Sequence, residues 1–533
     1  MMKLPRAAAK SESAFDLPAG RAGRQWLREL IERHGLREDP RRGREAVYFD
    51  TFDGRLHAHS LALWSSGGEL CLESIEPPGE ETRIRLDGFT ASAGTLPSGE
   101  LRDRLVSLTR NRALLKLFSM RSELRSWSKW NRDRKTVVRV SSTDDEVSDG
   151  KRRARLPPCI VVRRVRGYDK AFREVRDWCA ERAVPVEPGS RYRQALEALE
   201  VDPARAASLG RLELTLGMTA ADGVRAMLRA QYQVARGNEE GIRGDADVEF
   251  LHDFRVAVRR ARSFLGQFRG VFAPKPAAAL RKGLSWLGRS TNTLRDLDVY
   301  LQEQAYYRGM LTGPLVEDLD PLFDHAGRER DAAFHEFVTV MGSEAYRDTL
   351  RRWRQCVDGE AVLGVGRRGS EPVPRLAGAR MAKKCRAVLE EGRRIRGHAG
   401  PDAFHALRIE CKQLRYITEP VSGLMPETGR VVQRLKKLQD ALGRIQDLTV
   451  HEARSLDFAR DLSRGGDRRA LPAVEVLVSR MRVERELACA EVPGLFEQFS
   501  RSLRETEPPY AMLLPWLRDT TLESNVPETS RRR

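Results

Sequence analysis

Two stretches of the chain share one pattern: His252-Asp-Phe-Arg-Val-Ala-Val-Arg-Arg-Ala-Arg262 and His405-Ala-Leu-Arg-Ile-Glu-Cys-Lys-Gln-Leu-Arg415. Both read His-x-x-Arg-(Val/Ile)-x-x-(Arg/Lys)-x-x-Arg. An α-helix turns by about 100° per residue, so the four polar groups of each copy fall within one stripe about 80° wide. The apolar residues of the first copy gather on the other side of the same helix. The pattern predicts two amphipathic helices, each with one cationic face.

These stripes differ from an ordinary solvated helix face. An exposed face usually mixes charges of both signs, with Glu placed four residues before Lys or Arg. Neither stripe contains an acid. Arginine predominates, and its planar guanidinium binds phosphate oxygens through two parallel contacts. A solvated basic face is the alternative for either copy alone, but the arrangement occurs twice.

The repeat extends beyond the motifs. Residues 284–299 align without gaps to residues 435–450. The two copies are offset by 405 − 252 = 153 residues at the motif and by 447 − 296 = 151 residues at the second block. Two offsets that agree to within two residues indicate a duplicated unit. The second block places Asp296 and Asp447 at equivalent positions, where we expect them to cap helices or to orient the motif arginines.

These residues resemble the CHAD family (conserved histidine α-helical domain). The resemblance rests on the two His-x-x-Arg runs and on Arg295-Asp-Leu-Asp298, and it covers about residues 216–505. It implies a duplicated helical bundle with pseudo-twofold symmetry that binds inorganic polyphosphate. We place this domain at 216–510, with halves at about 216–365 and 375–510. Within it we expect helix breaks between 442 and 447 and between 490 and 494, and helix N-caps at Asp247 and Asp296.

Length and charge narrow the class of protein. A chain of 533 residues is long for one core, so two domains are expected. The net charge is 94 − 76 = +18, with a pI near 9.9, which predicts a polyanionic partner. Seven scattered cysteines without Cys-x-x-Cys spacing argue against a disulfide framework and a zinc site, and favour the reducing cytoplasm. No apolar run of about 18 residues is present to span a membrane.

The region before the duplicated unit has strand character. Residues 1–20 are expected to be a flexible leader, and residues 21–215 an α+β, β-rich domain. Strands are predicted at 46–51, 55–64, 69–75, 82–86, 122–129, 135–140 and 158–166, with an acidic loop at 141–150 and helices at 24–34, 169–182 and 190–200. Residues 520–533 are expected to be a disordered basic tail. The predicted fold class is thus multidomain, α+β and then all-α.

The first domain resembles the CYTH family, the triphosphate tunnel fold. The resembling residues are 48–56, the Leu61-Ala-Leu63 run with the Gly67-Gly68 hairpin, and residues 161–168 and 191–199. Active members carry a Glu-x-Glu-x-Lys strand that holds a metal, and the nearest stretch here is Ser11-Glu-Ser-Ala-Phe-Asp-Leu17. Trp64 and Ser74 stand where basic side chains are expected. The domain is therefore predicted to be a degenerate, non-catalytic tunnel fold, in which Arg83, Arg85, Arg125, Arg139 and Arg163 either line a basic barrel or lie exposed.

The predicted polyphosphate-binding residues come from both motifs and from nearby cations. They are His252, Arg255, Arg259, Arg262, His405, Arg408, Lys412, Arg415, Lys282, Arg434 and Lys437. The motif histidines start their stripes near helix N-termini, which favour anions. They have no second ligand at i+4, so neither a metal nor a cofactor is predicted. His57 and His59 lack a third ligand, and His451-Glu452 is expected on the surface.

The sequence therefore predicts a non-enzymatic, cytoplasmic polyphosphate-binding protein associated with polyphosphate or storage granules. Continuous Arg and Lys contacts suit a phosphate chain, which has no bases to read. One alternative is a metal-dependent triphosphatase or polyphosphatase that uses the first domain. The other is a nucleic-acid binder, although few aromatic residues interleave the basic stripes for stacking. Residual triphosphatase activity of the first domain also stays open.

Overall fold

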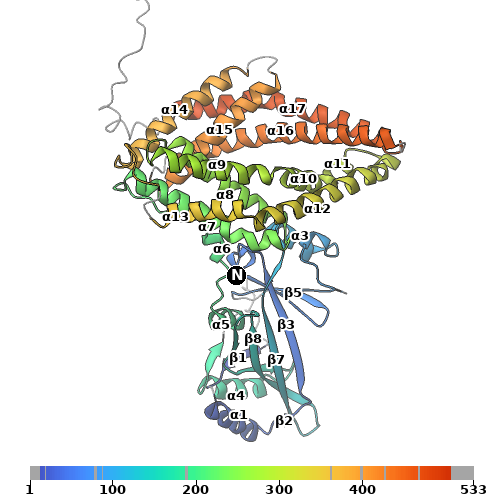
Figure 1. Cartoon of the computed structure of the whole chain (residues 1–533). Helices are drawn as coiled ribbons and strands as arrows, with labels where there is room; N and C mark the ends of the chain where they lie inside the picture. Colours follow the sequence, from blue (N-terminus) through green and yellow to red (C-terminus); the bar gives the residue numbers. More distant parts are fainter. Residues whose placement is uncertain are drawn as a thin grey trace, which may run out of the picture. The chain divides into compact units, whose positions relative to one another are not determined.

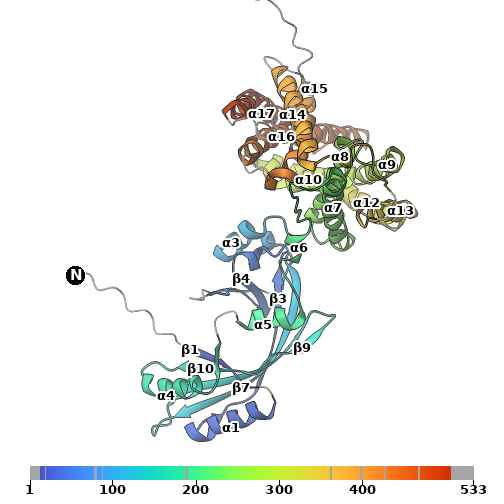
Figure 2. The same cartoon turned by 90° about the vertical axis from the view of Figure 1, so that its left-hand side faces the viewer.

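The computed structural model describes residues 12–18, 20–76, 81–86, 88–186, 190–359, 363–395, 400–424, 428–465 and 468–505. The chain divides into two compact units, Met1–Ser208 and Leu209–Arg533 (Figures 1 and 2). We call them the sheet unit and the helical unit. An antiparallel β-sheet domain followed by a helical region agrees with the predicted fold class.

The sheet unit is built on one antiparallel sheet. Its strands pair in the order β11-β1-β10-β8-β7-β3-β4-β5-β6, with β2 and β9 added on β7 and β8. The strands are β1 (Glu12–Asp16), β2 (Arg37–Glu38), β3 (Arg42–Asp50), β4 (Leu61–Ser66), β5 (Glu69–Ser74), β6 (Glu81–Arg85), β7 (Leu115–Trp130), β8 (Thr136–Ser148), β9 (Arg153–Arg155), β10 (Cys159–Arg164) and β11 (Val184–Val186). This β-rich architecture is consistent with the CYTH-like resemblance.

Helices bury the apolar residues of this sheet. Helices α1 (Arg21–His34) and α4 (Asp169–Ala180) contribute Trp26 and Trp178, whose ring centroids are 4.9 Å apart, to a core with Trp127 of β7. Helix α5 (Ser190–Leu199) brings Tyr192 onto Tyr48 in a second core. Shorter helices are α2 (Arg55–Ala58), α3 (Glu100–Thr109), α6 (Arg205–Ser208) and the 3₁₀ turn η1 (Ala93–Thr95).

Three predictions for the sheet unit are wrong. Residues 12–16, expected in the leader, form β1 and pair with β10 and β11; residues 1–11 and 19 lie outside the described residues. Residues 55–58 form α2 and not a strand, because the Asp50 carboxylate accepts the backbone N–H groups of Leu56 and His57 at 2.9 Å each. Most of the predicted acidic loop, residues 141–148, continues β8, where the Asp145 carboxylate pairs with the guanidinium of Arg191.

The helical unit follows the predicted pattern over most of its length. Its elements are α7 (Ala220–Arg243), α8 (Val248–Gln267), α9 (Pro274–Ser290), α10 (Asn292–Gln302), α11 (Gln304–Arg308), η2 (Gly313–Leu319), α12 (Asp320–Gly342), α13 (Glu344–Val357), α14 (Val373–Arg393), α15 (Pro401–Val421), η3 (Ser422–Leu424), α16 (Thr428–Gly465) and α17 (Leu471–Glu505). Asp247 caps α8 as expected, since its carboxylate accepts the N–H groups of Glu249 and Phe250.

The two copies of the repeat fold into corresponding helices with one difference. The motifs lie on α8 and α15, and the second block lies on α9 and α10 in the first copy and on α16 in the second. The first copy breaks at Thr291, whereas α16 runs unbroken for 38 residues, so the break predicted between 442 and 447 is wrong. A helical glycine such as Gly443 costs about 1 kcal/mol relative to alanine. Burial of Leu442, Ile445 and Leu448 outweighs that cost.

Two other expected features of the helices also differ. Helix α17 continues through Pro493, so the break predicted near it is absent from the described chain. Asp296 lies inside α10 and does not cap it; the residue at the N-cap position is Thr291.

Within the helical unit, the elements of the first half (green to yellow) and of the second half (orange to red) form two adjoining groups (Figures 1 and 2). The second group buries Leu407 and Leu414 of α15 against Leu435 and Leu438 of α16. The seven cysteines are free thiols. In the described parts of the chain, every helix is too short or too polar to cross a bilayer.

Candidate functional site

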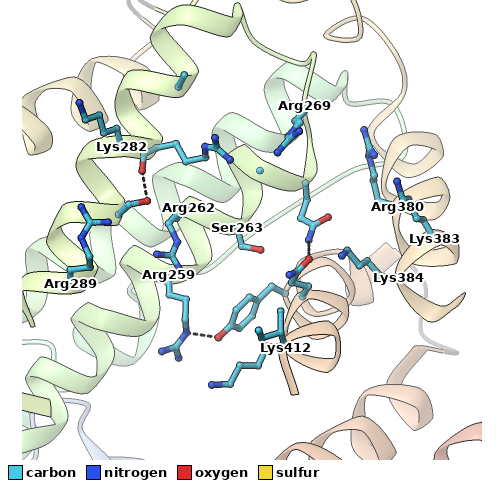
Figure 3. A pocket seen from close by; sticks show the side chains of 18 residues that line it. Arg259, Arg262, Ser263, Arg269, Lys282, Arg289, Arg380, Lys383, Lys384 and Lys412 are labelled. Atoms are coloured by element: carbon cyan, nitrogen blue, oxygen red, sulfur yellow. Dashed lines mark hydrogen bonds between the residues drawn. The ribbon is translucent and has the colours of Figure 1, made fainter. Parts of the chain in front are cut away.

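A basic cavity of 830 Å³ lies in the helical unit, between the two motif helices and their neighbours (Figure 3). Its walls come from α8 and α9 of the first half and from α14 and α15 of the second. Among the 18 described residues that line it, none is Asp or Glu and ten are Arg or Lys. The ten are Arg259, Arg262, Arg269, Arg281, Lys282, Arg289, Arg380, Lys383, Lys384 and Lys412. A space walled in this way by cations attracts an anion from both sides.

The motif helices meet at this cavity through direct side-chain contacts. Arg259 Nε of α8 donates a hydrogen bond to the Tyr416 hydroxyl of α15 at 2.5 Å. Gln267 Nε2 donates to Gln413 Oε1 at 2.8 Å. Arg259 and Arg262 of the first stripe and Lys412 of the second therefore line one cavity, although the motifs are far apart in the sequence.

Four of the eleven predicted binding residues line the cavity: Arg259, Arg262, Lys282 and Lys412. The other seven are His252, Arg255, His405, Arg408, Arg415, Arg434 and Lys437, and they lie outside its lining. Some of them form hydrogen bonds between helices, some act on the cavity through their charge, and some are exposed on the surface of α16.

Arg255 and Arg408 occupy equivalent positions of the repeat but have different surroundings. Arg255 Nη1 donates to the Gly288 carbonyl at 3.2 Å, to Thr291 Oγ1 at 2.5 Å and to Asn292 Oδ1 at 3.1 Å. Two of these acceptors are side chains that the second copy lacks, since Leu442 and Gly443 occupy the positions equivalent to Thr291 and Asn292. In the second copy α16 is continuous, and Arg408 makes no hydrogen bond or ion pair with any residue that the structure describes. Arg255 thus stabilises the α9–α10 junction, whereas the guanidinium of Arg408 has no hydrogen-bond partner among the described residues.

The motif histidines both face the second block of their own copy. Burial and the nearby charge of Arg295 lower the pKa of His252 to about 4, so its imidazole is neutral at physiological pH. His405 is exposed, and its Nδ1 lies 3.0 Å from Gln446 Oε1. Arg295 and Gln446 are equivalent positions of the repeat. Each motif histidine therefore has the residue at the same position of its second block as a neighbour, through charge in the first copy and through a hydrogen bond in the second.

Lys412 is the most perturbed cation of the cavity. Burial, followed by the charges of Arg408 and Arg259, lowers its pKa to about 7, while Asp447 acts in the opposite direction. Asp447 lies within α16 and so caps no helix; its influence on Lys412 and Arg408 is electrostatic. Adding an anion to this group of cations would relieve their mutual repulsion.

Tyr416 lies at the centre of a group of guanidinium groups. Arg259, Arg260 and Arg415 lie over its buried ring, with their Cζ atoms 5.8, 5.9 and 5.8 Å from the ring centroid. Glu419 balances two of them, since its carboxylate accepts from Arg260 Nη2 at 2.5 Å and lies 3.2 Å from Arg415 Nε. This arrangement fixes the arginines next to the cavity.

Arg434 and Lys437 are exposed on α16 and lie away from the cavity lining. Arg434 is one of the predicted binding residues, expected in the groove. Its side chain instead points to the surface, where Nη1 donates to Gln498 Oε1 at 3.3 Å.

Sequence reasoning missed six cations of the lining: Arg269, Arg281, Arg289, Arg380, Lys383 and Lys384. A signal was present, because Arg380, Lys383 and Lys384 have the i, i+3, i+4 spacing of one helix face. Arg281 and Arg289 lie eight residues apart, close to two helical turns. Of the cavity lysines, Lys384 is ion-paired, with Nζ 2.8 Å from Glu410 Oε2. Lys282 and Lys383 are exposed.

Two other histidine groups differ from expectation. His451 and Glu452, expected on the surface, are buried: His451 Nδ1 lies 2.5 Å from the Tyr307 hydroxyl, and Glu452 accepts from Arg482 and Arg485. His57 lies on α2 and His59 directly follows it, so they do not share a strand face. No group of three or more potential metal ligands is present among the described residues.

The arginines expected to line a basic barrel in the sheet unit lie on its surface. Arg85, Arg139 and Arg163 are exposed. Arg83 pairs with Glu81, and Arg125 Nη2 lies 2.9 Å from Glu38 Oε1. Arg191 instead lies between two acids, Asp16 and Asp145.

Comparison with known proteins identifies the helical unit. A family model described as the CHAD domain matches residues 226–455. Two similar solved structures are the crystal structure of the CHAD domain from the plant Ricinus communis and PptA from Streptomyces chartreusis. The first is 22% identical with a TM-score of 0.45, covering 54% of this chain and 94% of that chain. The second is 20% identical with a TM-score of 0.41, covering 53% of this chain and 99% of that chain. No match was found among curated proteins.

Proposed function

Since residues 226–455 form a CHAD domain, we propose that the basic cavity of this domain binds inorganic polyphosphate, without chemical conversion. One observation carries the proposal: ten Arg and Lys residues from both halves line a single cavity in which no described Asp or Glu takes part. A linear polyphosphate carries about one negative charge per phosphate and gains affinity from the release of counterions, as a nucleic-acid backbone does. Several phosphates fit within 830 Å³, so one chain would contact both walls.

The lining favours a phosphate polymer over a nucleic acid. Single-strand binders stack bases on aromatic side chains. Tyr416 is the one aromatic residue among the described lining, and it is buried, with its hydroxyl bonded to Arg259. No ring is therefore offered to a base. Competition between polyphosphate and single-stranded DNA at equal salt should show that polyphosphate displaces DNA.

The test is a titration with polyphosphate of defined length. It compares the wild type with two double variants that lose the same charge. Lys282→Ala/Lys383→Ala removes one exposed lysine from each wall of the cavity, and Lys436→Ala/Lys437→Ala removes two exposed lysines of α16 outside it. Both variants lower the net charge by two. We expect the cavity variant to lose at least tenfold in affinity. The slope of log affinity against log salt concentration should become shallower by about one to two units, since each phosphate contact contributes about 0.7–0.9.

Equal losses in the two variants would show that general charge, and not the cavity, attracts the polymer. A larger loss in the α16 variant would place the site on the surface that includes Lys437. Phosphate release from tripolyphosphate with Mg²⁺ would support a triphosphatase instead. Binding would also carry the protein to polyphosphate or storage granules, which the localisation of a fluorescent fusion tests.

A further inference from the structure

The four lysines of the cavity are not equivalent. Lys282 and Lys383 are exposed, and Lys384 is paired with Glu410. Lys412 is partly buried and forms no hydrogen bond or ion pair with any residue that the structure describes. Lys412 thus lines the cavity, next to Arg259, and its amine has no fixed partner among the described residues.

The charged groups around Lys412 are mostly cations. Arg259 faces it from α8, Arg408 and Arg415 from its own helix, and Asp447 from α16. Burial and the three arginines lower the pKa of Lys412 to about 7, so at neutral pH about half of its amines are uncharged and nucleophilic. An ordinary lysine, with a pKa near 10.4, has on the order of one amine in a thousand uncharged at this pH.

We propose that Lys412 is a modification site, acylated by small acyl phosphates that the cavity holds through their phosphate group. The neutral nitrogen attacks the carbonyl carbon of the acyl phosphate. The bond between that carbon and the bridging oxygen breaks, and inorganic phosphate leaves with the electron pair. The nitrogen loses its proton to the phosphate or to water. The products are an amide on Lys412 and free phosphate, with no oxidation or reduction.

The cavity suits this reaction because it stabilises the group that leaves. Negative charge builds on the departing phosphate, and fixed cations such as Arg259 and Arg262 stabilise it without rearranging. Lys282 and Lys383 share the cavity but are exposed. They therefore serve as internal controls for proximity to bound phosphate alone.

Acylation would reduce the binding of polyanions. The amide carries no charge, so one of the ten cations of the lining is lost, next to Arg408 and Arg259. This consequence rests on the proposed polyphosphate function, whereas the acylation itself does not.

The first experiment incubates the full chain with acetyl phosphate and follows each lysine by quantitative peptide mass spectrometry. We expect Lys412 to be acetylated at least tenfold faster than Lys282, Lys383 and Lys436 at pH 7.5. Its rate should level off at a lower pH than the rates of the control lysines, which continue to rise through pH 9. Equal rates, or parallel pH profiles, would overturn the proposal.

A second reagent separates reactivity from phosphate binding. An N-hydroxysuccinimide acetyl ester transfers the same acetyl group without a phosphate. We expect the preference for Lys412 over Lys282 to be larger with acetyl phosphate, and to fall when inorganic phosphate is added. The same preference with both reagents would overturn the selection of acyl phosphates by the cavity.

Polyphosphate protection distinguishes this proposal from the proposed function. Selective acetylation of Lys412 that polyphosphate suppresses supports both. Selective acetylation without protection supports the modification site and contradicts polyphosphate binding in the cavity. If polyphosphate protects Lys282 and Lys383 but Lys412 is not acetylated selectively, the result supports polyphosphate binding in the cavity and contradicts the modification site. Lys412→Arg should retain polyphosphate binding, and Lys412→Gln should weaken it as acetylation does.

Discussion

Arg259 and Tyr416 join the two halves of the helical unit by a 2.5 Å hydrogen bond from the guanidinium to the phenol oxygen. The bond fixes a cavity cation with a residue from the other copy of the repeat. Tyr416→Phe removes the acceptor and keeps the ring. We expect a loss of about 1–2 kcal/mol in unfolding free energy, as for a hydrogen bond to a charged group, and weaker polyphosphate binding. Urea denaturation and titration measure the two effects; unchanged values for both would contradict the role of this bond.

Arg255→Ala should act on stability more than on binding. The side chain donates to three acceptors at the α9–α10 junction and lies outside the cavity lining. Its loss leaves the buried Thr291 hydroxyl without this donor and removes two further hydrogen bonds, which should lower the unfolding free energy by about 2 kcal/mol. Arg262→Ala is the control, because Arg262 is exposed and lines the cavity; it should cost under about 0.5 kcal/mol and weaken binding. The opposite ranking of the two variants in urea denaturation would contradict this assignment.

Glu410→Gln should strengthen polyphosphate binding. The Glu410 carboxylate holds the Lys384 ammonium at 2.8 Å, and without its charge Lys384 is available to phosphate. We expect a gain of about two- to fivefold in affinity, which corresponds to about 0.5–1 kcal/mol. Glu336→Gln, on the exposed surface of α12, makes the same change in net charge and should leave the affinity nearly unchanged. Weaker binding by Glu410→Gln would mean that the pair positions Lys384 for the ligand.

Acid should destabilise the helical unit through His451. Burial lowers the pKa of His451 from 6.5 to about 4, so the unfolded chain binds more protons between these values and stability falls as the pH drops through them. The expected loss from this group is about 1.3 kcal/mol between pH 7.5 and pH 5.5. His451→Gln should reduce this pH dependence in urea denaturation, whereas His335→Gln, on the exposed surface of α12, should leave it unchanged. An identical slope in wild type and His451→Gln would contradict the prediction.

Polyphosphate binding should take up a proton at Lys412. The pKa of Lys412 is lowered to about 7, and a bound polyanion favours the charged amine and so raises that pKa. Above pH 7 the free protein must gain a proton to bind, so the affinity should fall by up to about tenfold per pH unit. Titrations at pH 6.5 and pH 8.5 measure this fall. Lys412→Arg, which stays charged, should abolish most of it; an unchanged pH dependence in that variant would assign the effect to other groups.

The helical periodicity and the doubled motif were enough to predict the helices that carry the site. Both motif helices and the Asp247 cap follow from patterns within a few turns of chain, whereas the meeting of the two helices is expected from the packing of two repeated halves. The break predicted between 442 and 447 is absent from α16. Packing of Leu442 and Ile445 against neighbouring helices decides the outcome there, and that packing is not visible in one segment of sequence.

The full lining of the cavity was harder to predict. The cations of α9 and α14 belong to the site because tertiary packing brings four helices together, and their sequence signal resembles that of any basic helix face. The same limit applies to Arg255 and Arg408. Their equal spacing predicted equal roles, yet Thr291 and Asn292 supply acceptors to Arg255, whereas Leu442 and Gly443 at the equivalent positions supply none to Arg408.

The crossing of α8 and α15 has a thermodynamic consequence, because each half of the repeat supplies one wall of the cavity. Neither wall alone encloses an anion, so occupancy of the cavity and docking of the halves are coupled equilibria. A bound phosphate polymer would resist their separation, by a free energy that grows with the logarithm of its concentration over its dissociation constant. When the ligand is absent, repulsion between the cations of the two walls would in turn make the empty domain the less stable of the two states.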